Sequence, residues 1–154
     1  TSEENINIVK EYYSNYKLIK SASEIKAKVV KIALYHHINS EKYIYNYVKQ
    51  FNKETKVIIS SPNWIDISEK GINKGNALKL IQNRHNIKKS ETLVFGDYNN
   101  DLEMLAEAKY SFAMENAHND VKSIAKYLTY SNDNFVVEHV LDLLIAQKTN
   151  SQKQ

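Results

Sequence analysis

The strongest indication of the fold is the segment from Leu93 to Leu105, which reads LVFGDYNNDLEML. An apolar, β-prone run ends at Gly96, two aspartates and two asparagines follow within five residues, and an amphipathic helix then begins. This order is typical of a parallel strand that leads through a short turn into a helix, and ligands bind at that end of such strands. Carboxylates grouped there are oxygen ligands of the kind that Mg²⁺ prefers, commonly together with substrate phosphates. The segment therefore predicts an α/β fold with a metal-assisted phosphate site.

The chain around this segment alternates between helical and β-prone patterns. From Lys74 onward, hydrophobic periodicity predicts helices over 74–85, 101–108, 119–125 and 136–146, and strands over 91–95, 110–114 and 127–129. Strands joined by single helices pair in parallel, which predicts a doubly wound sheet. The preceding part predicts helices over 3–17 and about 40–51, and strands over 29–35, 56–60 and 64–67. We place a boundary near Ile67–Ile72, after a strand–helix–strand module.

Composition excludes several classes of function. The absence of cysteine excludes a disulfide framework and a thiolate zinc site. The net charge of +3 arises from mixed lysine and acidic residues, which favours a solvated surface over a nucleic-acid-binding face. No apolar run approaches the roughly 20 residues that span a bilayer, and no signal peptide is visible. We therefore expect a cytoplasmic protein that binds neither nucleic acid nor membrane.

Five side chains are candidates for the site. Asp97 would bind Mg²⁺ directly, and Asp101 would act as a second ligand or would support Asp97. Helix capping is the alternative explanation, and it accounts for a single aspartate there but not for the whole Gly-Asp-x-x-Asn-Asp pattern. Lys74 stands at a predicted helix start, where free N–H groups already favour anions and a lysine adds a charge suited to phosphate. A surface lysine is the alternative. Asn100 and Asn116 can hydrogen-bond phosphate oxygens or orient the aspartates, or can simply form turns.

These residues resemble a known family. Trp64–Leu78 (WIDISEKGINKGNAL) resembles the third motif region of the Cof-type phosphatases of the haloacid dehalogenase (HAD) superfamily, and Gly96–Leu105 resembles their fourth motif. Ala113–Ala117 (AMENA) is similar to a later Ala-Met-x-Asn-Ala segment. The resemblance covers roughly residues 60–140. It implies a Rossmann-like core with a parallel sheet and an α+β cap domain.

The resemblance also assigns domains and roles. Residues 1–68 would be the C-terminal portion of the α/β cap, 69–147 the C-terminal part of the core, and 148–154 a polar tail. The implied activity is Mg²⁺-dependent hydrolysis of small phosphate monoesters, such as sugar or cofactor phosphates, through an aspartyl-phosphate. By motif position, Lys74 would neutralise the phosphoryl charge and Asp97 would hold the metal. Asn100 would contact phosphate, and Asp101 would support the metal or Lys74.

The chain departs from the family pattern in one decisive respect. The first motif, Asp-x-Asp-Gly-Thr, supplies the nucleophile and the acid/base, and no Asp-x-Asp occurs in these 154 residues. Glu115 and Phe135 also stand at or near positions that often hold glycine. We therefore expect an inactive C-terminal part of a phosphatase, whose partner is the missing N-terminal part or a second copy. Two alternatives stay open: a naturally truncated, non-catalytic module that binds phosphate, metal or a partner chain, and a phosphotransferase or mutase using the same site.

Overall fold

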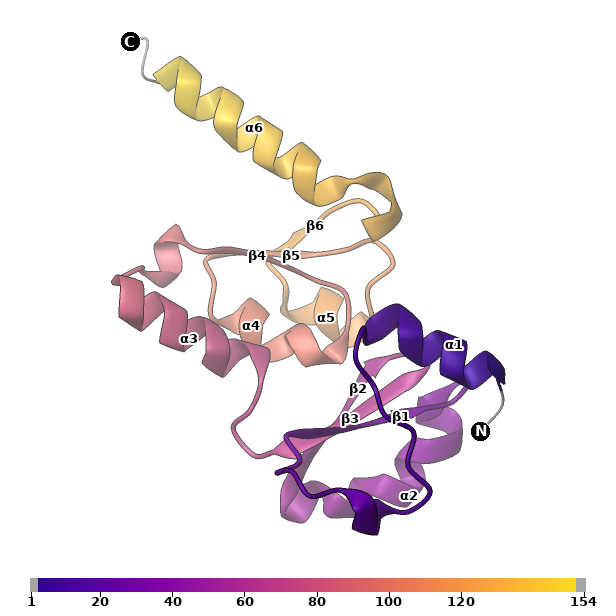
Figure 1. Ribbon diagram of the computed structural model, residues 1–154. Helices are drawn as coiled ribbons and strands as arrows, with labels where there is room; N and C mark the ends of the chain where they lie inside the picture. Colours follow the sequence, from indigo (N-terminus) through magenta and orange to yellow (C-terminus); the bar gives the residue numbers. More distant parts are fainter. Residues whose placement is uncertain (1–2, 152–154) are drawn as a thin grey trace.

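The computed structural model describes residues 3–151, which form two α/β modules one above the other (Figure 1). The first module holds α1 (Glu3–Tyr12), η1 (Ala22–Glu24), β1 (Lys31–Tyr35), η2 (Glu41–Tyr45), α2 (Asn46–Val48), η3 (Lys49–Lys53), β2 (Thr55–Ser61) and β3 (Trp64–Glu69). The second holds α3 (Lys74–His85), η4 (Lys89–Glu91), β4 (Leu93–Gly96), η5 (Asn99–Asp101), α4 (Leu102–Ala106), β5 (Tyr110–Ala113), α5 (Asn119–Ile124), β6 (Tyr127–Leu128), η6 (Asn132–Asn134) and α6 (Val136–Ser151). Helices and strands therefore alternate as the sequence predicts.

The first module is built on an antiparallel sheet with the strand order β1-β3-β2. Side chains alternate along β3, so Ile65 and Ile67 lie on the face that packs against Val57, Ile59 and the helical segments 41–53. The opposite face presents polar side chains, including those of Asp66 and Ser68. The helical segments form one π-turn stretch (η2), a short α-helix (α2) and one 3₁₀ stretch (η3), where the sequence predicted a single helix.

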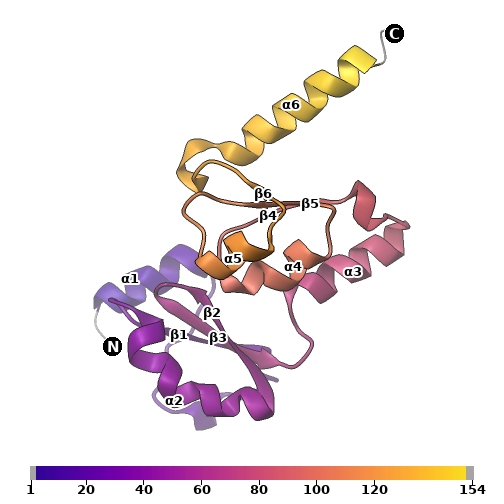
Figure 2. The same ribbon diagram turned by 180° about the vertical axis from the view of Figure 1, so that it is seen from behind.

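The second module is built on a parallel sheet with the strand order β4-β5-β6, which confirms the predicted pairing. Helices α3, α4 and α5 lie on one face of this sheet (Figures 1 and 2). Its core contains Val94, Leu105, Ala113, Val121 and Val136. The opposite face carries a row of aromatic rings, Phe95, Phe112 and Tyr127, with centroids 5.4 and 5.0 Å apart.

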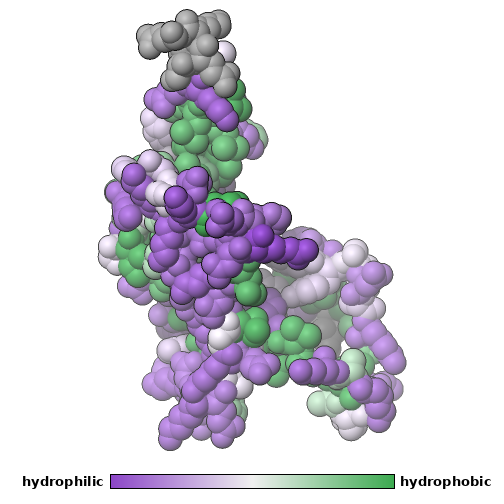
Figure 3. All heavy atoms as spheres, turned by 90° about the vertical axis from the view of Figure 1, so that its left-hand side faces the viewer, coloured by the Kyte–Doolittle hydropathy of each residue, from purple (hydrophilic) through white to green (hydrophobic). Residues whose placement is uncertain are grey.

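The chain ends differently from the prediction. The predicted polar tail from residue 148 is helical through Ser151, because Gln147 and Lys148 are good helix formers and no glycine or proline stops α6 after them. Residues 152–154 lie outside the described part. The helix extends away from the sheet and leaves Leu141, Leu143 and Ile145 about half exposed or more, visible as green along its length in Figure 3. At the other end, α1 stops at Tyr12 rather than 17. No helix within residues 3–151 combines the length and apolarity needed to cross a membrane.

Phe135 joins η6 to α6 in a left-handed conformation with φ 48°. Its side chain is 76% exposed, so little packing offsets the steric cost of a Cβ there. Replacing Phe135 with glycine is expected to raise the free energy of unfolding by about 0.5–1 kcal/mol, measured by urea denaturation. Phe135→Ala is the control, since it removes the ring and keeps the Cβ. An equal gain from alanine would assign the effect to the ring instead of the backbone.

Candidate functional site

The predicted site residues gather at the carboxyl end of β4, and two glycines let them approach. A Cβ on Gly96 would lie 2.8 Å from the Cβ of Asp101, so Asp101 can pack against the strand end only because Gly96 has no side chain. A Cβ on Gly75 would lie 2.6 Å from the backbone of Glu103 in α4. Glycine at this position therefore lets α3 approach α4, which brings Lys74 to Asp101.

Asp101 anchors the turn. Its side chain is almost fully buried, and its Oδ1 lies 2.5 Å from the Nζ of Lys74. Its Oδ2 accepts hydrogen bonds from the backbone N–H groups of Asp97 (3.0 Å) and Tyr98 (3.4 Å). Both carboxylate oxygens thus have protein partners. Of the two roles that the sequence left open for Asp101, these bonds favour support of Lys74 and the turn; direct metal binding by Asp101 stays a prediction.

Asp97 is half-buried beside this anchor. Burial, and then the negative charge of Asp101, raise the pKa of its carboxyl above the ordinary value, while Lys74 acts in the opposite direction. Its Oδ2 accepts a hydrogen bond from the Nδ2 of Asn132 at 3.3 Å. The surroundings of Asp97 therefore disfavour its ionised form, and a bound cation would offset that effect.

Asn132 is a site residue that the sequence reasoning missed. Its Oδ1 accepts from the Nδ2 of Asn116 at 2.9 Å, and its backbone N–H donates to the Oδ1 of Asn116 at 3.3 Å. Asn116 therefore reaches Asp97 through Asn132, and has no direct bond to it among the described contacts. Asn132 follows β6, whose carboxyl end lies at the same edge of the sheet as that of β4. The position of Asn132 shortly after a predicted strand is the one feature of the sequence that could have identified it as a site residue.

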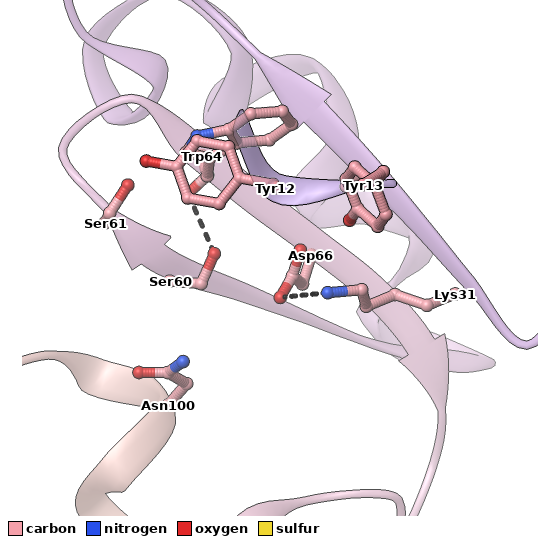
Figure 4. A pocket seen from close by; sticks show the side chains of 9 residues that line it. Tyr12, Tyr13, Lys31, Ser60, Ser61, Trp64, Asp66 and Asn100 are labelled. Carbon is pink, nitrogen blue, oxygen red and sulfur yellow. Dashed lines mark hydrogen bonds and ion pairs between the residues drawn. The ribbon is translucent and has the colours of Figure 1, made fainter. Parts of the chain in front are cut away.

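Asn100 points toward the first module's sheet, on the side that carries Ser60 and Asp66 (Figure 4). It lines a cavity of about 220 Å³ with Tyr12, Tyr13, Lys31, Ala33, Ser60, Ser61, Trp64 and Asp66. The Nζ of Lys31 lies 3.2 Å from the Oδ2 of Asp66 on the wall opposite Asn100. A neighbouring cavity of about 370 Å³ is lined by Asn100, Lys74 and the same ion pair, among others. The two cavities connect the Lys74 end of the site with the first module.

The turn after β4 offers oxygen ligands of the kind that Mg²⁺ requires. Asp97 supplies a carboxylate, and Asn99 of the same turn has a buried Oδ1 without a hydrogen-bond partner. Residues 3–151 contain no group of three or more His, Cys, Asp or Glu side chains arranged to hold a metal ion. Proteins commonly bind Mg²⁺ through one or two carboxylates, with water and substrate phosphate completing the shell. The residues present therefore fit part of a magnesium site.

Comparisons with known proteins find similarity to haloacid dehalogenase-like hydrolases and phosphatases. The family model described as haloacid dehalogenase-like hydrolase matches residues 1–141. The 5-amino-6-(5-phospho-D-ribitylamino)uracil phosphatase YbjI of Escherichia coli is 44% identical over 81 residues, which are 53% of this chain and 30% of that protein. The phosphatase YwpJ of Bacillus subtilis is 36% identical over 93 residues, which are 60% of this chain and 33% of that protein.

A solved structure agrees over nearly the whole chain. The crystal structure of SMU.1108c from Streptococcus mutans aligns with a TM-score of 0.83 and 32% identity, covering 94% of this chain and 55% of that one. The chain thus spans about a third of the curated relatives it matches and about half of this structural neighbour.

Proposed function

The chain belongs to the haloacid dehalogenase-like hydrolase family, and on that premise we propose that it forms the phosphate- and Mg²⁺-binding part of a phosphatase acting on small phosphate monoesters through an aspartyl-phosphate. The observation that carries this proposal is the continuous contact from Lys74 through Asp101 to the turn of Asp97 at the carboxyl end of β4. This contact places the Lys74 ammonium, which can bind a phosphoryl group, close to the turn that carries the Asp97 carboxylate, which can bind a metal ion.

Each residue has a physical task in this proposal. Asp101 fixes the Lys74 ammonium, whose side chain is half exposed and so can also contact an incoming phosphoryl oxygen. Asn132 orients the Asp97 carboxylate through a hydrogen bond, and Asn116 holds Asn132. Mg²⁺ bound at Asp97 would neutralise charge on the phosphoryl group, where catalysis is mainly positioning and electrostatics.

The nucleophile must come from elsewhere, and the sheet has a place for it. In the described part of the chain, β4 pairs with β5 along one edge and with no strand along the other. An unpaired strand edge is a template for another strand. We propose that a segment carrying the Asp-x-Asp motif adds a parallel strand there, because the carboxyl end of that strand would lie beside Asp97. A second copy of this sequence has no Asp-x-Asp to offer.

The substrate's leaving group is proposed to lie in the cavity of Figure 4, between Asn100 and the first module. The Lys31–Asp66 ion pair and Ser60 offer hydrogen-bond donors and acceptors, and Tyr12 and Trp64 offer apolar rings 5.6 Å apart. Such a wall suits a small polar organic group, as in sugar or cofactor phosphates. The substrate in the name of the E. coli relative is one candidate of this kind.

Binding and turnover test the proposal separately. The purified chain of verified mass is expected to bind inorganic phosphate in a Mg²⁺-dependent manner by calorimetry, and to hydrolyse no p-nitrophenyl phosphate. Mg²⁺-dependent hydrolysis by the chain alone would contradict the missing nucleophile. Failure to bind phosphate with Mg²⁺ present would contradict the site itself.

Because no Asp-x-Asp occurs in these 154 residues, we carry a second candidate function, a module that binds phosphate, metal or a partner chain without catalysis. The coding sequence upstream of Thr1 separates the two. An in-frame Asp-x-Asp-Gly-Thr supports the phosphatase, whereas a stop codon supports the module.

A further inference from the structure

Tyr98 belongs to both modules at once. It follows Asp97 in the turn at the end of β4, and its backbone N–H is held by the Oδ2 of Asp101. Its side chain nevertheless packs against the apolar cluster of the first module, which is formed by Val57, Ile59 and Ile65. Burial, followed by the charges of Glu41 and Asp97, raises the pKa of its hydroxyl, as expected for a ring withdrawn from water.

The contacts around Tyr98 join the same two parts of the chain. Lys56 of β2 forms an ion pair with Glu103 of α4. Asn100, two residues after Tyr98, faces the polar side of the first module's sheet across the cavity of Figure 4. The turn that presents Asp97 is therefore also a contact surface between the modules.

The backbone of this turn is held from two sides. Within the second module, the Asp101 carboxylate accepts hydrogen bonds from the backbone N–H groups of Asp97 and Tyr98. The backbone N–H of His118 donates a hydrogen bond to the carbonyl of Asp97 at 2.9 Å. From the first module, the contact is the packing of its apolar cluster against the Tyr98 ring, and the centroid of the same ring lies 5.5 Å from that of the His118 ring in the second module. The ring is partly buried and packs against that apolar cluster, so its position depends on the position of the first module. A shift of the first module would therefore pull on the residue next to Asp97.

We propose that Tyr98 is a positioning residue through which the apolar core of the first module fixes the turn that carries Asp97. Coupling between two such parts is reciprocal, so a ligand that orders the turn also holds the first module against the second. The proposal concerns the free chain and does not require that the site hydrolyse phosphate.

The test compares Tyr98→Ala and Tyr98→Phe with Ile44→Ala, a matched control that removes an apolar side chain from the same cluster but away from the turn. Hydrogen exchange of the Asp97 and Tyr98 amides, relative to amides of β5, is expected to accelerate about tenfold or more in Tyr98→Ala. Tyr98→Phe is expected to retain the parent rates, since the ring is kept. Ile44→Ala is expected to loosen the first module without this selective acceleration.

A second readout measures the modules directly. The chain has no cysteine, so spin labels can be placed at Glu54→Cys in the first module and Arg84→Cys in the second, both exposed positions. The distribution of distances between the labels is expected to be narrow in the parent and in Tyr98→Phe, and broad in Tyr98→Ala. If Tyr98→Ala does not fold, Tyr98→Leu is measured in its place. Exchange rates and distances that match those of Ile44→Ala would overturn the proposal.

Discussion

Replacing Asp101 with alanine is expected to lower the free energy of unfolding of this chain by about 3 kcal/mol. The Asp101 side chain is 4% exposed, and its carboxylate accepts hydrogen bonds from Lys74 and from the backbone N–H groups of Asp97 and Tyr98. Without it, the two N–H groups stay partly buried without an acceptor, and a cavity opens against Gly96. Urea denaturation followed by the fluorescence of Trp64 and by circular dichroism measures the loss.

The matched control is Glu91→Ala. The Glu91 carboxylate also accepts a hydrogen bond from a backbone N–H group, that of Lys88 at 2.8 Å. This bond lies at the surface, where water can take the place of the carboxylate as acceptor. We expect this control to cost less than about 1 kcal/mol. If Asp101→Ala cost no more than Glu91→Ala, the carboxylate would not be the anchor of the turn.

Asp97→Asn is expected to weaken Mn²⁺ binding, used as a probe for the Mg²⁺ site, by at least about tenfold, because it removes the charged oxygen ligand of the turn. Calorimetric titration of the parent and the variant measures the ratio of dissociation constants. Asp133→Asn is the control, since it removes the same charge from an exposed position near the site. Equal affinities in parent and Asp97→Asn would exclude Asp97 as a metal ligand.

The same substitution is expected to stabilise the metal-free chain at neutral pH. The pKa of Asp97 is raised in the folded state above its ordinary value of 3.8, so the folded chain holds the proton more tightly than the unfolded chain does. Stability therefore falls as pH rises from 3.8 through the raised pKa, and the whole penalty is present above that window. Asparagine does not titrate. The free energy of unfolding of the variant minus that of the parent should therefore grow from acidic to neutral pH, as measured from the midpoints of urea denaturation. Added Mg²⁺ should reverse this difference, because it stabilises the parent alone. A variant less stable than the metal-free parent at neutral pH would contradict this account.

Local patterns in the sequence predicted much of the fold. Helix α3 begins and ends where predicted, at Lys74 and His85, because Asn73 caps its first turn through the backbone N–H of Asn76 and Asn86 ends it in a left-handed conformation. The parallel pairing of β4, β5 and β6 followed from strands joined by single helices. These features depend on neighbours within a few positions, so the sequence carries them directly.

The features of the candidate site likewise fall into those that local sequence patterns indicate and those that depend on tertiary packing. Local sequence patterns alone indicate that Gly96 ends a strand, that Asp97 and Asp101 follow it, that Lys74 opens a helix, and that no Asp-x-Asp is present. Three features became visible only in the folded chain: both carboxylate oxygens of Asp101 accept hydrogen bonds, Asn132 rather than Asn116 contacts Asp97, and Tyr98 packs against the apolar cluster of the first module. The reason is distance along the chain. Lys74 and Asp101 are 27 residues apart, and Asp97 and Asn132 are 35 apart, so their meeting depends on how helices and sheets pack and not on any local pattern.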